Sequence, residues 1–489
     1  MLFYNVLQVV GKLLIPLSFV FLPPAILAYY EMEDHIAFLE CFGMTFLSGL
    51  VLFILSRKTT LQFTPKEGFA SVVFSWVLLC VFGSFPYFLM DLGVNDIKFV
   101  DALFETVSGF TTTGSSVLQD IEALPKSLLL WRSLTQWIGG MGIILLFLAV
   151  LPTLGAGGFQ LFRAEIPGPI KDKLSPKIRK TAIYLWITYI VLTILLFFCL
   201  LSITEMGWYD AICHSLTTIS TGGYSTKNTS VLSFNSWKVD LIITLFMFLS
   251  SCNFVLLIQL MKGKMNKIIF NNELQLFVSI IFACIVFITI QHYIFSKNSI
   301  SWMNSLRQAA FQVVTVVSST GFATDDFDLW TSSSKLLVLA LMMMGGCAGS
   351  TSGGMKVFRV LVIIKYGLKE IKRLIHPRAI INVTFDKVEL GEGLVRVING
   401  FLCLYVITIF ISTFLLILFE NGRFSGLGLA STSITCISNI GPGFNEFGPT
   451  DNFYKLSDSS KYCLSFLMLL GRLELFSILV LFHPDFWKR

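Results

Sequence analysis

Ten apolar runs, each long enough to cross a bilayer, divide this 489-residue sequence. A helix needs about 20 predominantly apolar residues to span the hydrocarbon core. Only 13% of the residues are charged, against about 25% in a typical soluble domain, so a soluble fold is excluded. The sequence predicts an all-α integral membrane protein with ten transmembrane helices. The runs are Val10–Ala28, Ile36–Leu55, Phe69–Met90, Leu128–Leu151, Ala182–Ile203, Val239–Leu260, Leu274–Phe295, Leu336–Ile364, Val395–Phe419 and Tyr462–Phe482.

Basic residues gather in alternate loops, after the second, fourth, sixth and eighth runs, whereas the first loop carries Glu31, Glu33 and Asp34. Because short loops rich in Lys and Arg stay on the cytoplasmic side, we expect both termini to be cytoplasmic. This asymmetry accounts for the net charge of +6, so no nucleic-acid partner is indicated. The basic loops at Lys171–Lys180 and Lys365–Arg378 could contact either a protein partner or anionic membrane lipid.

A short semi-apolar stretch ending in small residues and a glycine occurs four times, in the outward connections from the third run onward. Its glycines, Gly114, Gly222, Gly321 and Gly441, are 108, 99 and 120 positions apart by subtraction. Each glycine follows a predicted helix too short to cross a bilayer. These predicted re-entrant helices are Ala102–Phe110, Asp210–Thr218, Leu306–Val317 and Leu427–Cys436.

The recurrence predicts four pseudo-symmetric units, each made of a span, a pore helix, a turn and a second span. Non-helical backbone at membrane depth is tolerated only beside protein or water, so we place the four turns around one water-filled pore. The predicted organisation is an N-terminal two-helix membrane domain followed by four pore repeats. Their bounds are 1–66, 67–163, 164–268, 269–378 and 379–489.

The four turns have the composition of a cation selectivity filter. Glycine permits the torsions that aim successive carbonyl oxygens at a dehydrated ion. The turns contain no ring of Asp or Glu, which argues against a filter for divalent cations. One such turn alone would usually be an ordinary loop, and Asn439 and Ile440 make the fourth the weakest match. The predicted filter residues are Thr112, Thr113 and Gly114; Ser220, Thr221 and Gly222; Ser319, Thr320 and Gly321; and Asn439, Ile440 and Gly441.

A glycine-rich segment, Gly345–Gly354, interrupts the eighth run. Five glycines in ten residues disfavour a helix by about 1 kcal/mol each, and unwound backbone in a membrane is expected beside a cavity. Arg472, in the middle of the last run, could donate to the carbonyls of this segment. The predicted gate is therefore Gly345, Gly346, Cys347, Ala348, Gly349, Ser350, Thr351, Ser352, Gly353, Gly354 and Arg472.

Alternatives to the gate are close helix packing through small residues and a structural ion pair for Arg472, with Glu474 assigned to a partner elsewhere. Lys356 and Arg359 follow the segment at helical spacing. Their simplest interpretation is the cytoplasmic bias of basic residues, and the alternative is a role in coupling the segment to a cytosolic regulator.

Three further motifs accompany the turns: Lys66–Phe69, Gln136–Gly142 and Phe162–Pro169. Together these residues resemble the Trk/Ktr/HKT superfamily of potassium transporters, within it the bacterial TrkH and TrkG type. The resemblance implies potassium uptake across the bacterial cytoplasmic membrane, a preference for potassium from the four glycines, and gating by the glycine-rich segment with Arg472. It also implies a homodimer and a cytosolic nucleotide-binding regulatory subunit similar to TrkA. Potassium is then the substrate, with no covalent cofactor, and nucleotide acts only through the regulatory subunit.

Two rival classes are less favoured. A transporter of organic solutes would usually show broken helices paired across two halves, and only the eighth run is clearly interrupted. A membrane enzyme would need a cluster of His, Asp, Glu or Cys at membrane depth, which is not evident, so we do not expect an enzyme. The sequence leaves open whether transport is passive or coupled to protons or sodium.

Overall fold

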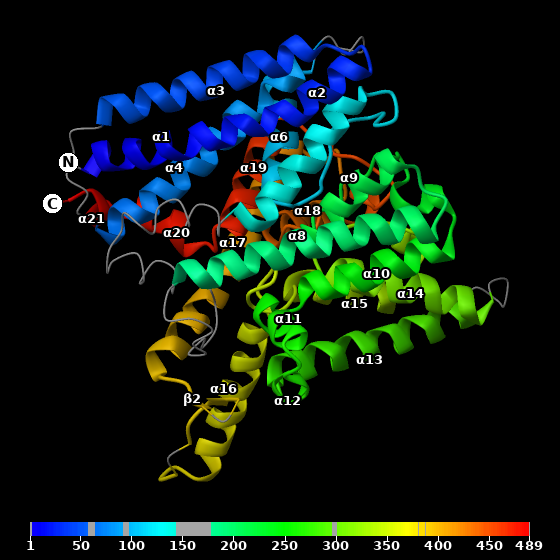
Figure 1. Ribbon diagram of the computed structural model, residues 1–489. Coiled ribbons are helices and arrows are strands. Elements are labelled where there is room, and N and C mark those ends of the chain that lie inside the picture. The colour runs from blue at the N-terminus through cyan, green and yellow to red at the C-terminus, as the bar shows by residue number, and fades with distance from the viewer. Residues whose placement is uncertain are drawn as a thin grey trace.

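The computed structural model describes residues 2–56, 64–90, 97–142, 178–295, 301–379, 381–386 and 388–488, and it is built almost entirely from helices (Figure 1). Among these residues, six helices are long and apolar enough to cross a membrane, or eight if each of two bent pairs counts as one span. The end of the predicted fourth span, the 162–169 motif, the boundary between the first two units and residues 171–177 of the basic loop lie outside the described residues.

The N-terminal part is a pair of spans. Two Pro residues stand at the start of α2, where their missing N–H groups are tolerated. The elements are α1 (Leu2–Ser18), η1 (Phe19–Phe21), α2 (Leu22–Tyr30) and α3 (His35–Ser56). Helices α1 and α3 pack along each other at one edge of the molecule (Figure 1), and Gly11 lies directly against the backbone of Gly49.

Long and short helices alternate along the remaining part of the chain. Ser and Thr N-caps start several of them; Thr331, for example, accepts the Ser334 N–H. The helices of the first half are α4 (Pro65–Ser84), α5 (Pro86–Leu89), α6 (Phe99–Phe110), the helical residues 126–142, α8 (Ile178–Ile203), α9 (Trp208–Ile219), η2 (Ser230–Phe234), α10 (Trp237–Ser251), α11 (Phe254–Met261) and α12 (Met265–Ile269).

The second half repeats this order and ends in short C-terminal helices. A two-stranded antiparallel hairpin pairs Thr384 with Glu389 beside α16. The elements are α13 (Asn272–Phe295), α14 (Trp302–Val317), η3 (Phe327–Leu329), α15 (Ser332–Met344), α16 (Val357–Ile375), β1 (Thr384–Phe385), β2 (Val388–Glu389), α17 (Glu392–Glu420), α18 (Gly426–Ser438), η4 (Asn445–Phe447), α19 (Asp458–Arg472), α20 (Phe476–Leu479), η5 (Val480–Phe482) and α21 (Pro484–Trp487).

Within the described residues, three second helices are broken, which corrects the prediction of a single break. Besides the gap between α15 and α16, α10 and α11 meet at 106° and α19 and the C-terminal turns meet at 110°. The two missed breaks lie in sequence that is apolar overall and carries no proline. Asn253 starts α11 by accepting the Val255 N–H, and Glu474 and Leu475 adopt positive φ angles at the other break.

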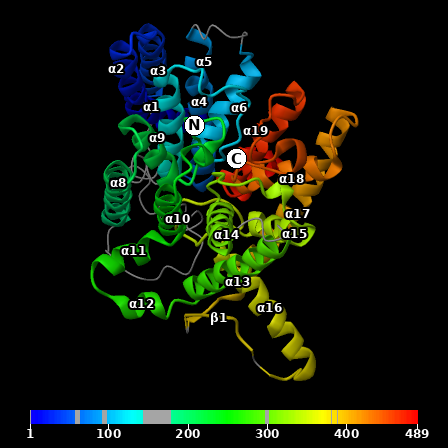
Figure 2. The same cartoon turned by 90° about the vertical axis from the view of Figure 1, so that its right-hand side faces the viewer.

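The outward faces of the long helices carry large apolar side chains, including Ile54 on α3, Phe282 on α13 and Phe410 on α17, each more than half exposed. The interior contains large apolar clusters together with many buried Ser and Thr side chains. This is the arrangement expected of helices surrounded by lipid, whose polar groups must be satisfied inside the protein. Helix α16 and strand β1 extend away from the helical body (Figure 2).

Close packing of α1 on α3 predicts that replacing one glycine destabilises the protein much more than replacing another. A Cβ atom at Gly11 would lie 2.7 Å from the Gly49 carbonyl oxygen, whereas nothing lies within 4 Å of one at Gly43. Gly11→Val should therefore lower the unfolding free energy by about 1–3 kcal/mol, and Gly43→Val should change it little. Thermal unfolding of the detergent-solubilised protein checks this, and equal midpoints for the two variants would contradict the packing.

Candidate functional site

The four short helices α6, α9, α14 and α18 each end in a turn of the same conformation. A residue with positive φ, between 54° and 56°, is followed two positions later by a glycine with φ between 80° and 103°. The residue between them donates its N–H to a carbonyl of the preceding helix at 2.9–3.0 Å. The four triplets are Thr112-Thr113-Gly114, Thr221-Gly222-Gly223, Ser319-Thr320-Gly321 and Asn439-Ile440-Gly441.

The second turn is therefore shifted by one residue from the predicted Ser220-Thr221-Gly222. Sequence similarity alone aligned Ser220 with Thr112, because both begin a small-hydroxyl pair before a glycine. The backbone instead aligns Thr221 with Thr112, and Gly223 with the other three turn glycines. Ser220 caps the end of α9 and donates its hydroxyl to the Thr217 carbonyl.

The four turns meet in a closed ring. A Cβ atom at any of the four turn glycines would overlap the carbonyl oxygen of the middle residue of the next turn. The contacts run in chain order, and the last turn meets the first: Gly114 on Gly222, Gly223 on Thr320, Gly321 on Ile440 and Gly441 on Thr113. We call the carbonyls of Thr113, Gly222, Thr320 and Ile440 the ring carbonyls.

Hydrogen bonds across the junction of the fourth and first turns strengthen the ring. The Asn439 amide donates to the Thr113 hydroxyl at 3.0 Å, and the Ser115 hydroxyl donates to the Gly441 carbonyl at 3.1 Å. Farther out, the Lys461 ammonium of α19 is 2.6 Å from the Asp101 carboxylate of α6, in a nearly buried ion pair. Residues 326 to 360 positions apart in the chain are thus joined by three separate contacts.

The helical residues 126–142 pack against both of the first two turns. A Cβ atom at Gly139 would overlap the Phe110 carbonyl oxygen, and one at Gly140 would lie 2.8 Å from Ser220 Cβ. A Cβ atom at Gly109 of α6 would lie 2.3 Å from the Thr135 hydroxyl oxygen. The Gln136–Gly142 motif is therefore a close-approach surface, which the sequence singled out without assigning it a role.

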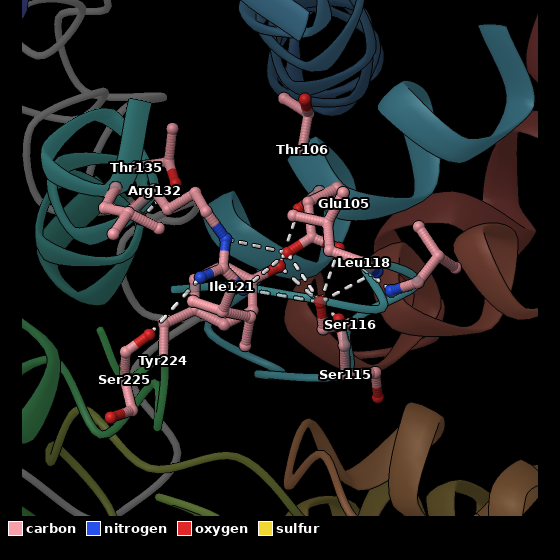
Figure 3. A network of polar contacts seen from close by, with 12 residues as sticks. Glu105, Thr106, Ser115, Ser116, Leu118, Ile121, Arg132, Thr135, Tyr224 and Ser225 are labelled. Atoms are coloured by element: carbon pink, nitrogen blue, oxygen red, sulfur yellow. Dashed lines mark hydrogen bonds and ion pairs between the residues drawn. The ribbon is translucent and has the colours of Figure 1, made fainter. Parts of the chain in front are cut away.

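A buried ion pair lies behind the first turn (Figure 3). Arg132 donates to the Glu105 carboxylate through Nε at 2.9 Å and Nη2 at 2.7 Å. The same carboxylate accepts from the Ser116 hydroxyl and from the Val117 N–H. The Arg132 guanidinium also stacks 4.1 Å from the centre of the Tyr224 ring, in the segment after the second turn. The sequence analysis missed this pair, because two charges 27 positions apart carry no periodic signal.

The predicted gate segment lies against three of the four turns. Thr351 donates its hydroxyl to the Ile219 carbonyl at 3.2 Å and accepts from Thr221 at 3.3 Å. The Gly353 N–H donates to the Ser319 hydroxyl at 2.5 Å, and a Cβ atom at Gly353 would overlap the Ser438 carbonyl oxygen. The segment thus packs where the carboxyl-terminal ends of these short helices meet the ring.

Arg472 reaches the glycine-rich segment, as predicted from the sequence. Its Nη1 donates to the Thr351 carbonyl at 3.0 Å and its Nη2 to the Gly139 carbonyl at 2.5 Å. The guanidinium is buried and connects this segment to the helical residues 126–142. Within the described part of the chain, its direct partners are therefore two carbonyls and not a carboxylate.

Lys356 and Arg359, which follow the glycine-rich segment, are buried and have partners within the protein. Both are 8% exposed. The Lys356 ammonium donates to the Ser352 carbonyl, and Arg359 forms an ion pair with Glu474 beside the break in the last span. The Arg359 guanidinium also stacks 4.1 Å from the Phe401 ring centre. Glu474 therefore pairs with a residue other than Arg472, in accord with the prediction.

Exposed polar contacts also join the loop that follows the first turn to its neighbours. The Asn228 amide donates to the Asp120 carboxylate at 2.9 Å, and this hydrogen bond lowers the pKa of Asp120. Lys126 pairs with Glu31 at 2.8 Å, which raises the pKa of Lys126. These contacts join the first loop, the first unit and the second unit on one face.

Comparison with known proteins gives one consistent result. The family model described as TrkH, cation transport protein, matches residues 35–489. The Trk system potassium uptake protein TrkH of Escherichia coli K12 is 36% identical over 99% of both chains. TrkG of the same strain is 35% identical over 96% of this chain and 95% of its own. The crystal structure of the potassium transporter TrkH from Vibrio parahaemolyticus superposes with a TM-score of 0.88 at 33% identity and covers 100% of both chains.

The Glu105–Arg132 pair predicts a non-additive stability effect. Removing one partner of a buried ion pair leaves an unpaired buried charge and costs about 3–5 kcal/mol. Arg132→Met should therefore be strongly destabilising, and Glu105→Gln added to it should restore part of the loss. The exposed Lys98–Asp458 pair is the control, because such pairs contribute about 0–1 kcal/mol. Thermal unfolding that shows additive losses would contradict the pairing.

Proposed function

This chain belongs to the TrkH family of cation transport proteins, and from that premise we propose that it takes up potassium through one gated pathway inside the ring of four turns. It is a multi-pass membrane transporter and not an enzyme. The two E. coli relatives, TrkH and TrkG, are named as potassium uptake proteins.

Closure of the ring is the observation that carries this proposal. Four turns from distant parts of the chain bring their ring carbonyls to one level, each against the glycine of the preceding turn. A ring of backbone carbonyls can replace the hydration shell of a monovalent cation. The four triplets contain no Asp or Glu, so the coordinating charge would be the partial charge of carbonyls, which suits potassium better than a divalent ion.

The direction of the four short helices also favours a cation. Helices α6, α9, α14 and α18 all present their carboxyl-terminal ends to the ring. The carboxyl end of a helix carries about half a negative elementary charge. Four such ends at one place stabilise a positive ion, whereas a site for an anion would use amino-terminal ends.

The glycine-rich segment is proposed as the gate. It packs on the helix side of the ring through Thr351 and Gly353, where an ion leaving the ring toward the cytoplasm would pass. Arg472 fixes it by donating to the Thr351 carbonyl. We propose that this hydrogen bond holds the closed state and that opening requires the segment to move.

The wider arrangement is proposed on the same basis. Ten spans with both termini cytoplasmic, and four pore repeats at 67–163, 164–268, 269–378 and 379–489, account for the order of helices and for the recurring turn. The relatives are parts of a Trk system, which supports a partner: we propose a TrkA-like cytosolic nucleotide-binding subunit and a homodimer. The projecting α16, with its basic residues, is the proposed contact for that subunit.

The filter proposal predicts that Gly114→Ser changes ion preference. The added Cβ atom would overlap the Gly222 ring carbonyl and displace it. Purified protein in liposomes should take up rubidium with a preference for potassium over sodium, and the substitution should reduce that preference by about tenfold, which corresponds to about 1.4 kcal/mol. Gly422→Ser is the matched control, because Gly422 also has positive φ but lies in open space. An unchanged preference in Gly114→Ser would contradict the filter.

The gate proposal predicts that Arg472→Ala increases rubidium uptake measured without any regulatory subunit. Hydrogen bonds to a charged group contribute about 1.5–3 kcal/mol each, so loss of the Thr351 and Gly139 contacts should raise the open fraction by about tenfold or more. Arg423→Ala removes an exposed arginine and should leave uptake unchanged. Equal or lower uptake by folded Arg472→Ala protein would show that this hydrogen bond does not hold the closed state.

A further inference from the structure

The second turn differs from the other three in lacking a side chain at the ring carbonyl. In the first turn, the Thr113 hydroxyl is 2.7 Å from the Thr111 hydroxyl. In the third, the Thr320 hydroxyl is 2.7 Å from the Ser318 hydroxyl, and in the fourth the Ile440 side chain is fully buried. Gly222 has no side chain with which to fix the second ring carbonyl.

Gln136 occupies the space that such a side chain would take. A Cβ atom at Gly222 would meet the Gln136 side chain, and its nearest three atoms would all belong to that residue. Gln136 is fully buried and comes from the helical residues 126–142, the second span of the first unit. The first unit therefore fills the gap left in the second turn.

The Gln136 amide binds both sides of the second turn. Its Nε2 donates to the Gly222 ring carbonyl at 2.6 Å, and its Oε1 accepts the Tyr224 N–H at 3.0 Å. The Gly222 carbonyl can only accept a hydrogen bond and the Tyr224 N–H can only donate one, so the two contacts fix which end of the Gln136 amide faces each group. Neither Glu, which lacks the donor when ionised, nor Met can make both.

We propose that Gln136 is a positioning residue for potassium selectivity, holding the Gly222 carbonyl in the ring. This inference rests on the proposed role of the ring as the selectivity filter. Among the four ring carbonyls, and within the described part of the chain, only that of Gly222 accepts a hydrogen bond from a side chain. A carbonyl oxygen has two lone pairs, so one remains to coordinate an ion.

A neighbouring contact supports the same role. Arg132 lies one helical turn before Gln136 and therefore on the same face. It donates to the Ser225 carbonyl at 3.4 Å and stacks on the Tyr224 ring (Figure 3). One helix face thus binds the whole segment 222–225. Selectivity among monovalent cations depends on the number and placement of carbonyl ligands, so a displaced Gly222 carbonyl should weaken discrimination more than it reduces flux.

The test compares Gln136→Met with the wild-type protein in liposomes, measuring the ratio of potassium to sodium uptake and the total rubidium uptake. Loss of the two amide contacts should lower the ratio by about tenfold, with rubidium uptake retained. Gln312→Met is the matched control: Gln312 is also buried and donates to a backbone carbonyl, that of Asp325, outside the ring, and its ratio should stay at the wild-type value. A wild-type ratio in Gln136→Met overturns the inference.

A size exchange provides a second, independent variant. Gly222→Ala should lose uptake, because its methyl group meets Gln136, and adding Gln136→Ala should restore uptake with a lowered ratio. A double variant with a wild-type ratio would overturn the positioning role even if Gln136→Met does not fold. The proposed function fails separately: a wild-type protein that takes up potassium and sodium equally excludes the filter itself, whatever the variants do.

Discussion

The structure depends on the close approach of four glycines to four carbonyl oxygens. Each turn glycine lies where a side chain would overlap the next ring carbonyl, so the turns can be this close only if each ends in glycine. The short helices, the motif around Gly139 and the pairs Glu105–Arg132 and Asp101–Lys461 all lie behind the ring. They bring together segments that are distant in the chain, and the charges that do so are buried and paired, as buried charges must be.

The breaks in the second helices are linked to one another. A broken helix in a membrane leaves N–H and carbonyl groups without partners, at a cost of several kcal/mol each. Here two of the breaks provide hydrogen-bond partners for each other. At the break between α10 and α11 and the one between α15 and α16, the Cys347 N–H donates to the Ser251 carbonyl at 2.9 Å, and the Phe254 N–H donates to the Gly349 carbonyl at 3.1 Å. Any movement of the glycine-rich segment would therefore also break hydrogen bonds that satisfy the gap between α10 and α11.

The features that could be predicted from the sequence are those that neighbouring residues determine. The short helices and the turn glycines Gly114, Gly321 and Gly441 were found because length, apolarity and glycine are local signals. The one-residue shift to Gly223 was missed because two adjacent glycines fit the pattern equally, and only the neighbouring turn distinguishes them. The breaks before α11 and α20 were missed because each is stabilised by partners far away in the chain: Cys347 and Gly349 bond across the first, and Arg359 pairs with Glu474 at the second.

We propose that a potassium ion is coordinated by the ring carbonyls of Thr113, Gly222, Thr320 and Ile440. The most direct measurement is an anomalous-diffraction map of crystals grown with rubidium in place of potassium, compared with crystals grown in sodium. We expect a rubidium peak on the axis of the ring, at the level of these four oxygens, and no such peak in crystals grown in sodium. A rubidium peak elsewhere, with none inside the ring, would contradict it.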